Sequence, residues 1–321
     1  MEARRSAQSS GCVLVIGMWL GLLLLPTGGM GQVLVAGPDN AVVEYDREGS
    51  LVGFFVAPGS GISDPEGLAF GPDGNLYVSS YNTAEVFRFE GGTGALMGVF
   101  VSAASGGLGG AGRIAFGPDD NLYVASCNSG EVLRYDGTTG DFIDAFVAAG
   151  SGGLSCPFPI VFGSDGRLYV GTALNDSVLR YDAITGTFVD TFVSPGSGGL
   201  SGPFGMSSSP NGDLLVTSVD TDQVLRYDGI TGDFLGVFVD AGSGGLASPF
   251  DLAFGPDGDL YVTDATSNGE TVLHYDGVSG AFAEAFDVVG DNTCTALLFV
   301  FDIFADSFES GDTTAWSAVG P

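Results

Sequence analysis

Short apolar runs separated by turn-forming residues cover most of the chain. In one representative stretch they span Arg113–Gly117, Asn121–Ala125, Glu131–Asp136 and Asp141–Ala148. Each run is rich in β-branched and aromatic side chains and is bounded by Gly, Pro, Asp or Asn, which is typical of β-strands. Because no segment shows a sustained helical periodicity, the pattern predicts an all-β fold.

The group of four runs repeats with a period of 46 residues. The leucine of the motif Gly-Pro-Asp-Gly-x-Leu-Tyr-Val marks this interval, at Leu76, Leu122, Leu168, Leu214 and Leu260. The aromatic residue of a second motif, Val-Leu-Arg-Tyr-Asp, keeps the same period apart from two extra residues in the last unit. Four antiparallel strands in a repeat of about 40–50 residues indicate the blades of a β-propeller.

The number of blades follows from the two ends of the repeat region. Five complete units begin at equivalent positions, near Glu66, Gly112, Phe158, Phe204 and Phe250. The segment Gln32–Val56 matches the last three strands of a sixth unit, and the apolar run Ala296–Phe301 matches its missing first strand. Pairing these two segments closes the ring and removes two exposed sheet edges. We therefore predict a six-bladed propeller of four-stranded antiparallel blades over residues 32–302.

Both termini lie outside this repeat. Residues 1–31 have the features of an export signal, because Arg4 and Arg5 precede the apolar run Val13–Leu25, which is too short to span a bilayer. A retained membrane anchor is the alternative. We expect a secreted, periplasmic or cell-surface protein that is not inserted in a membrane after the signal is removed. Residues 303–321 form a short acidic tail.

Charge limits the classes of partner. The chain has 39 acidic and 9 basic residues, a formal net charge of −30, and all of the basic residues are Arg. Such a charge argues against nucleic acid and against anionic membranes, because phosphate groups attract basic surfaces. We expect a monomer without a cofactor, whose partner is a protein or a small molecule.

Three cysteines follow the signal segment, and they allow one disulfide. Cys127 and Cys156 belong to neighbouring blades and are expected on the same face of the ring, so they are the candidate pair. The spacing of Cys127, Cys156 and Cys294 matches no zinc or redox motif.

The repeat units resemble a known family. The unit Phe250-Asp-Leu-Ala-Phe-Gly-Pro-Asp-Gly-Asp-Leu-Tyr-Val, followed by Val272-Leu-His-Tyr-Asp, is similar to the NHL-type propeller repeats of secreted bacterial proteins. The resemblance extends over residues 32–301 and implies a propeller, while such repeats serve both enzymes and binding proteins. Residues 303–317 resemble a short tail found on many exported bacterial proteins.

One repeat position on the third strand carries a positive or titratable side chain in every complete unit. These residues are Arg88, Arg134, Arg180, Arg226 and His274. We expect them to form structural ion pairs, because Arg suits bidentate contacts with carboxylates. The expected partners are the acids that follow two residues later, Glu90, Asp136, Asp182, Asp228 and Asp276. The turn residues Asp73, Asp165 and Asp257 are expected to stabilise hairpins, since a calcium site needs about six to eight oxygens.

Candidate binding residues gather at one end of the predicted central channel. Glu66, Arg113 and Asp251 stand at or next to the start of a first strand, where the other units have Phe, Pro or Gly. They are candidates for a polar ligand or a cation, and solvated rim charges are the alternative. Polar loops between the second and third strands vary most between units and are expected on the same face. These loops contribute three further ligand-binding candidates, Tyr81, Asn128 and Asn175.

The sequence therefore favours an exported interaction or ligand-binding module without catalysis. The alternative is a hydrolase or lyase, because the resemblance includes gluconolactonase and virginiamycin B lyase propellers. Those relatives hold a divalent metal with Glu, Asp and Asn, or use a histidine as acid–base. Here Glu66 and Asp251 are weak metal-ligand candidates, and His274 stands on a third strand, away from the channel. We therefore predict no metal and no catalytic residue.

Overall fold

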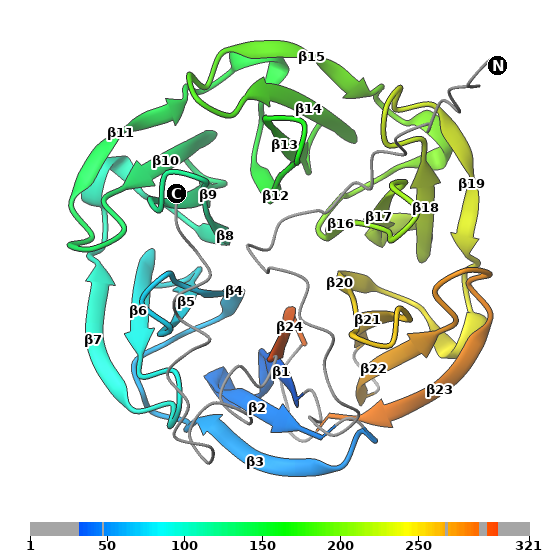
Figure 1. Cartoon of the computed structure of the whole chain (residues 1–321), viewed down its shortest axis with the longest axis horizontal. Coiled ribbons are helices and arrows are strands. Elements are labelled where there is room, and N and C mark those ends of the chain that lie inside the picture. Colours follow the sequence, from blue (N-terminus) through cyan, green and yellow to red (C-terminus); the bar gives the residue numbers. More distant parts are fainter. Residues whose placement is uncertain (1–31, 47, 267–268, 289–293, 301–321) are drawn as a thin grey trace, which may run out of the picture.

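The computed structural model describes residues 32–46, 48–266, 269–288 and 294–300. Within these ranges the chain forms six four-stranded antiparallel sheets arranged as the blades of a β-propeller (Figure 1). The predicted signal segment, residues 1–31, and the predicted tail, residues 303–321, lie outside the described residues. The described part of the chain contains no helix of the length and hydropathy needed to cross a membrane.

Each blade runs from an inner strand that lines the channel to an outer strand at the circumference. Blade 1 contains β24 (Ala296–Val300), β1 (Gln32–Ala36), β2 (Val42–Tyr45) and β3 (Leu51–Val56). Blade 2 contains β4 (Pro65–Phe70), β5 (Leu76–Ser80), β6 (Glu85–Phe89) and β7 (Leu96–Val101). Blade 3 contains β8 (Ala111–Phe116), β9 (Leu122–Ser126), β10 (Glu131–Tyr135) and β11 (Phe142–Val147).

The remaining three blades continue the same order. Blade 4 contains β12 (Pro157–Phe162), β13 (Arg167–Thr172), β14 (Ser177–Asp182) and β15 (Phe188–Val193). Blade 5 contains β16 (Met206–Ser208), β17 (Leu214–Ser218), β18 (Gln223–Tyr227) and β19 (Phe234–Val239). Blade 6 contains β20 (Pro249–Phe254), β21 (Leu260–Thr266), β22 (Gly269–Tyr275) and β23 (Phe282–Asp287). Short 3₁₀ turns lie at Pro38–Asn40, Ser105–Gly107, Ser151–Gly153, Ser197–Gly199, Val219–Thr221 and Ser243–Gly245.

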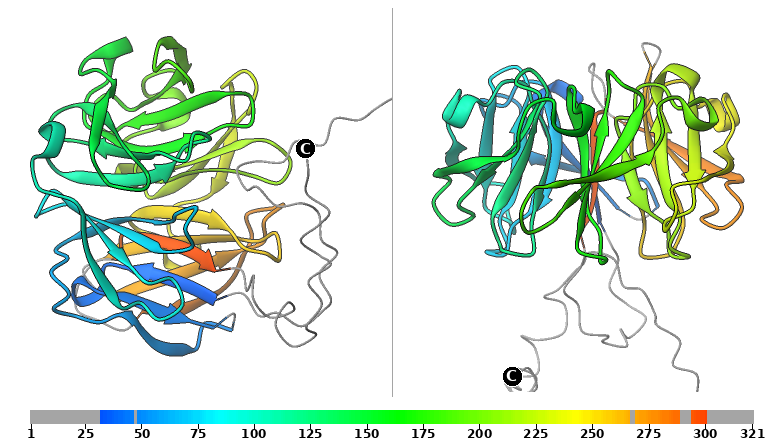
Figure 2. Two further views of the ribbon diagram at one scale, coloured as in Figure 1. Left: turned by 60° about the vertical axis from the view of Figure 1, so that its left-hand side comes forward. Right: turned by 90° about the horizontal axis from the view of Figure 1, so that it is seen from above.

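The two ends of the repeat region close the ring, as the sequence predicts. Strand β24 pairs antiparallel with β1, with Ala296 opposite Ala36 and Val300 opposite Gln32. Figures 1 and 2 show β24 as the inner strand of the blade that also contains the N-terminal strands. Blade 1 therefore joins residues that are more than 250 positions apart, and this pairing supplies backbone partners to the facing edges of β1 and β24.

The hairpin turns explain why each unit folds locally. In the first turn of blade 2, the Asp73 carboxylate accepts hydrogen bonds from the Asn75 backbone N–H and the Tyr77 hydroxyl, both at 3.1 Å. Gly74 closes this turn with φ = 75°, a conformation that favours glycine. Asp120 takes the same place in blade 3 with φ = 59°. Asp165 and Asp257 accept the same pair of hydrogen bonds in blades 4 and 6, so the hairpin role predicted for Asp73, Asp165 and Asp257 is confirmed.

The connectors between blades pack against the strands of the blade that follows them. The third-strand tyrosines Tyr135, Tyr181 and Tyr227 are fully buried, and each donates its hydroxyl hydrogen bond to a serine carbonyl of the preceding connector at 2.7–2.8 Å. Gly152, in the Gly-Ser-Gly-Gly-Leu connector before blade 4, has φ = 62°, and a Cβ there would lie 2.1 Å from the Phe188 ring. These glycine segments are therefore structural connectors.

The arginines on the third strands form ion pairs, but with different acids from those predicted. Arg134 makes a bidentate contact with Asp144, its cross-strand neighbour on the outer strand, at 3.1 and 2.6 Å. Arg180 contacts Asp190 in the same way. The predicted partner of Arg134, Asp136, lies beyond the strand end, where its carboxylate accepts the backbone N–H groups of the next turn. The expectation for the partners was wrong because register, rather than sequence distance, decides which side chains face each other.

Candidate functional site

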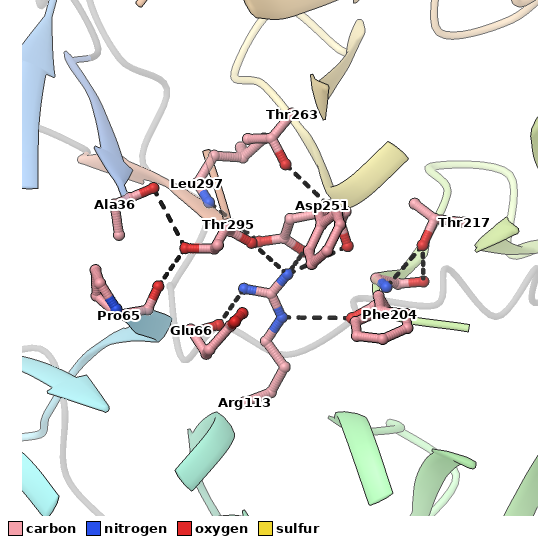
Figure 3. Close-up of polar contacts among 12 residues, drawn as sticks. Ala36, Pro65, Glu66, Arg113, Phe204, Thr217, Asp251, Thr263, Thr295 and Leu297 are labelled. Carbon is pink, nitrogen blue, oxygen red and sulfur yellow. Dashed lines mark hydrogen bonds and ion pairs between the residues drawn. The ribbon is translucent and has the colours of Figure 1, made fainter. Parts of the chain in front are cut away.

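The three charged candidates of the channel come together at its centre. Glu66 lies on β4, Arg113 on β8 and Asp251 on β20, each on the inner strand of its blade. Figure 3 shows the Arg113 side chain reaching across the channel to the other two residues. Glu66 is 7% exposed and Arg113 is 8% exposed. The interpretation of these residues as solvated rim charges is therefore wrong, because the inner strands converge closely enough to bury them.

Arg113 contacts all five of the other blades. Its guanidinium donates hydrogen bonds to the backbone carbonyls of Glu66 in blade 2, Phe204 at the start of blade 5 and Phe250 in blade 6. A further bond, of 2.7 Å, goes to the carbonyl of Thr295, directly before β24 of blade 1. The guanidinium carbon also lies 5.9 Å from the ring centre of Phe158 in blade 4, within cation–π range. One side chain thus links the inner ends of the whole ring.

Asp251 is the counter-charge of Arg113. Its Oδ1 lies 3.3 Å from Nη2 of Arg113, and its Oδ2 accepts the backbone N–H of Leu297 at 3.0 Å. Burial raises the pKa of the Asp251 carboxyl, and the Arg113 charge opposes that rise. The ion pair therefore also connects blade 6 to the closing strand β24.

Glu66 has an unusual environment for a carboxyl group. Its Oε2 is buried and has no hydrogen-bond partner within the described part of the chain. Burial raises the pKa of Glu66 to about 8, with the Arg113 charge acting in the opposite direction. Burial therefore favours the neutral form of Glu66 at neutral pH, and Asp251 lies against the Arg113 guanidinium.

The pKa of Glu66 predicts a dependence of stability on pH. Between pH 4.5, the ordinary pKa of Glu, and about 8, the folded state binds more protons at this group than the unfolded state. The free energy of unfolding therefore falls as the pH rises through that range, by an amount on the order of 4 kcal/mol. Urea denaturation between pH 5 and pH 9 measures this slope. Glu66→Gln should reduce it, and an unchanged slope in that variant would contradict the assignment.

The surroundings of Glu66 and Asp251 disfavour a divalent cation. Such an ion needs several charged or carbonyl oxygens with available lone pairs. Both oxygens of Asp251 already face donors, and burial favours the neutral form of the Glu66 carboxyl. The guanidinium of Arg113 occupies the position next to Asp251 and supplies the positive charge that a metal ion would bring. Repulsion between this charge and a second cation opposes metal binding.

A second group of possible metal ligands lies at the hairpins of blade 6. Single ligand atoms of Asp257, Asp259 and His274 fall within 4.8 Å of one another. Each is already engaged: Nε2 of His274 lies 2.9 Å from Asp259, and Asp257 accepts the Tyr261 hydroxyl at 2.8 Å. The His274 ring also stacks on Tyr261 at 4.4 Å. Because His274 occupies the repeat position of the paired arginines, we assign this group a structural role.

The loop candidates lie on one face of the ring, in the loops that follow the second strands of blades 2, 3 and 4. Tyr81 and Asn128 converge on Gly110, where an added Cβ would lie 2.9 Å from the Tyr81 ring and 3.0 Å from Nδ2 of Asn128. Asn175, in the next blade, donates a hydrogen bond to the Gly153 carbonyl. Asn128 and Asn175 are exposed and Tyr81 is half-buried. We call Tyr81, Asn128 and Asn175 the loop arc.

A disulfide joins two segments of this face. Cys127 follows β9 in blade 3, and Cys156 directly precedes β12 in blade 4. The bond lies between the loop that carries Asn128 and the loop that carries Asn175, since the Cys156 carbonyl accepts the Ala173 N–H at 3.1 Å. The remaining described cysteine, Cys294, is buried beside the closing strand.

Sequence reasoning missed two features of the site. Thr295 occupies the position in blade 1 that Glu66 has in blade 2, and its carbonyl accepts a hydrogen bond from Arg113. Extending the repeat alignment into the closing strand would have identified it. A further repeat position, at the end of the second strand, holds the connectors. The hydroxyl of Ser126 donates to the Gly109 carbonyl and that of Thr172 to the Ser155 carbonyl, whereas Asp264 accepts the N–H groups of Ala247 and Ser248.

Comparison with known proteins gives the fold. No model of a known protein family matches the chain, and no curated protein matches it. A chain from the crystal structure of a nidogen/laminin complex is similar, with a TM-score of 0.66 and 16% sequence identity, over 84% of this chain and 98% of that chain. A protein of unknown function from Bacteroides caccae has a TM-score of 0.63 and 15% identity, over 85% of this chain and 99% of that chain. At these identities the likeness shows the β-propeller fold alone.

Proposed function

We propose that the protein is an exported, non-catalytic β-propeller that binds another protein through the loop arc. The observation that carries this proposal is the position of Arg113. Its hydrogen bonds to four backbone carbonyls and its ion pair with Asp251 commit the charged residues of the channel to holding the blades together. Binding then falls to the loops around the channel, where polar side chains stand on a rigid framework.

The composition of the loop arc and the charge of the chain describe the partner. Tyrosine supplies a large, rigid contact surface, and asparagine supplies adaptable hydrogen bonds. The net charge of −30 attracts a protein with a basic surface and accelerates its association. The similar chain in the nidogen/laminin complex comes from an assembly of proteins, which supports the choice of a protein partner.

An affinity experiment tests the proposal. The protein without residues 1–31 is immobilised and exposed to cell-envelope and culture-medium proteins of the source organism, and a retained protein is purified and titrated by calorimetry. The triple variant Tyr81→Ala/Asn128→Ala/Asn175→Ala should bind that protein at least tenfold more weakly. Binding should also weaken as salt is added, because salt screens surface charges.

A matched variant on the opposite face controls for general loss of surface area. Ile184 and Val278 are 81% and 85% exposed at turns between third and fourth strands. Ile184→Ala/Val278→Ala should leave the affinity unchanged. The proposal is wrong if this pair loses the partner while the loop-arc variant, with an unchanged melting temperature, retains it.

The alternative function is a hydrolase or lyase with its site at the channel, and one observation favours it. A buried carboxyl with a pKa of about 8, such as Glu66, is the kind of group that serves as a general acid. The lactonase-like form of this alternative also requires a divalent metal at Glu66 and Asp251. The charge of Arg113 opposes that metal, so the two functions predict different outcomes in a metal titration.

Calorimetric titration with calcium, magnesium and zinc separates them. We expect no binding tighter than the many surface carboxylates give, and no change in the double variant Glu66→Gln/Asp251→Asn. Micromolar binding that disappears in the double variant would favour the lactonase-like function. The same titration of Asp257→Asn measures any contribution from the acidic hairpin of blade 6.

A further inference from the structure

The junctions of blades 2 and 3 and of blades 3 and 4 each contain a stack of three aromatic rings. Tyr77 of blade 2 lies 4.8 Å from Phe100 of its own outer strand and 4.9 Å from Phe116 of the next blade, measured between ring centres. Tyr123 of blade 3 repeats this arrangement with Phe146 and Phe162, both at 4.9 Å. The next-blade phenylalanine stands at the end of an inner strand, where it faces the tyrosine edge-on.

The junction between blades 4 and 5 lacks the third member of this stack. Tyr169 lies 5.0 Å from Phe192 of its own outer strand. The next-blade position holds Ser208, which pairs with Leu214 as Phe116 pairs with Leu122. A hydroxymethyl group thus replaces a benzyl group at this position.

A pocket of about 180 Å³ occupies the place of the missing ring. Its walls include Tyr169, Phe192, Leu214 and Ser208, and Ile230, which is 82% exposed, lies at its edge. An engineered apolar cavity of about 150 Å³ is large enough to bind benzene. The pocket therefore has the volume and the walls for one aromatic ring.

Two charged residues, Arg180 and Asp165, line the pocket. The Arg180 guanidinium lies 4.8 Å from the centre of the Phe192 ring and contacts Asp190 through two hydrogen bonds of 3.0 and 2.6 Å. Asp165 accepts the Tyr169 hydroxyl at 3.1 Å. Arg180 and Asp190 neutralise each other, and the remaining Asp165 carboxylate repels an anion, so the pocket favours a neutral ligand over an anionic one.

We propose that the junction of blades 4 and 5 is a binding site for a small neutral aromatic compound, whose ring takes the place that phenylalanine holds in the equivalent junctions. The ring packs against Tyr169 and Phe192 in the edge-on geometry of the other stacks, and Ser208 offers a hydroxyl to a polar substituent. Turns between first and second strands and between third and fourth strands form the pocket, so it opens on the face opposite the loop arc. The site is therefore independent of the proposed protein-binding function.

Fluorobenzene is the probe for this site. Wild-type protein should bind it saturably with one-to-one stoichiometry in ¹⁹F NMR titrations, and saturating fluorobenzene should raise the melting temperature. Ser208→Phe restores the ring of the repeat and should weaken binding at least tenfold. Ser208→Ala keeps the pocket empty and should bind fluorobenzene as the wild type does. Absence of binding to the wild type, or equal binding to Ser208→Phe, would overturn the proposal.

Two further measurements locate the ligand and its source. Nuclear Overhauser effects between the ligand fluorine and the methyl groups of Leu214 or Ile230 would place the ring in the pocket. This measurement uses the wild-type protein and needs no substitution. Absence of these effects from a saturated sample would exclude this pocket. N-acetylphenylalanine amide represents a partner's side chain, and we expect it to bind more weakly than fluorobenzene. Tighter binding of the amide would overturn the assignment to a small molecule.

Discussion

Replacing Arg113 with methionine is expected to lower the free energy of unfolding by about 3–5 kcal/mol, because it leaves a buried carboxylate without its counter-charge. Methionine fills much of the same volume but donates no hydrogen bond. Asp251 then loses the guanidinium at 3.3 Å, and the carbonyls of Phe204, Phe250 and Thr295 lose their donor in the channel. Urea denaturation at pH 7 measures the change.

Arg167 provides the matched control for this substitution. It forms an ion pair with Asp182 at 3.0 Å, but about one third of each side chain is exposed. Surface pairs of this kind contribute little, so Arg167→Met should leave the denaturation midpoint nearly unchanged. Equal effects of the two substitutions would show that Arg113 does not hold the ring together.

Truncating the chain at Asp291 is expected to reduce stability even more, by over about 4 kcal/mol. The truncation removes β24, whose five residues pair with β1 and whose Ala296 and Leu297 are buried between blades 6 and 2. It also exposes an unpaired edge of β1 in the channel, which favours association between molecules. Thermal denaturation and gel filtration measure both effects.

Truncation at Asp306 separates the closing strand from the tail that follows it. This shorter deletion keeps β24 and should leave the melting temperature unchanged. A melting temperature equal to that of the Asp291 truncation would mean that stability depends on the tail instead of on β24.

The effects of the Arg113 substitution and the Asp291 truncation should not be additive. Arg113 donates to the Thr295 carbonyl, and Asp251 accepts the Leu297 N–H, so both ends of this ion pair contact the closing segment. Residues that share one network show coupling in double-mutant cycles. The combined variant is therefore expected to lose less stability than the sum of the two single changes.

The repeat made the architecture readable from the sequence. Blade number, strand positions and ring closure all follow from the 46-residue period and from turns such as Pro72-Asp73-Gly74, which depend on residues close together in the chain. Local turn chemistry and alternating side chains act within one unit, so each copy of the motif reports the same structure. The predicted edges of the strands in blade 3 agree with the structure to within two residues.

The substitution that forms the aromatic pocket is also visible in the sequence, but its consequence is not. Aligning the units shows that Ser208 replaces a phenylalanine. A serine on a strand is compatible with a packed surface, a water site or a pocket. Only the position of Tyr169, in the neighbouring blade and 39 residues earlier, shows that a ring is missing there.

The propeller, its closure and the residues that break the repeat follow from the sequence. The contacts that those residues make arise only in the folded ring. Arg113 is a charged residue at a strand start in the sequence, whereas in the ring its hydrogen-bond partners lie 47 to 182 positions away. Most of these partners are backbone carbonyls, which every residue possesses and which leave no mark in the sequence. The burial that raises the pKa of Glu66 also arises only when the blades converge around one channel.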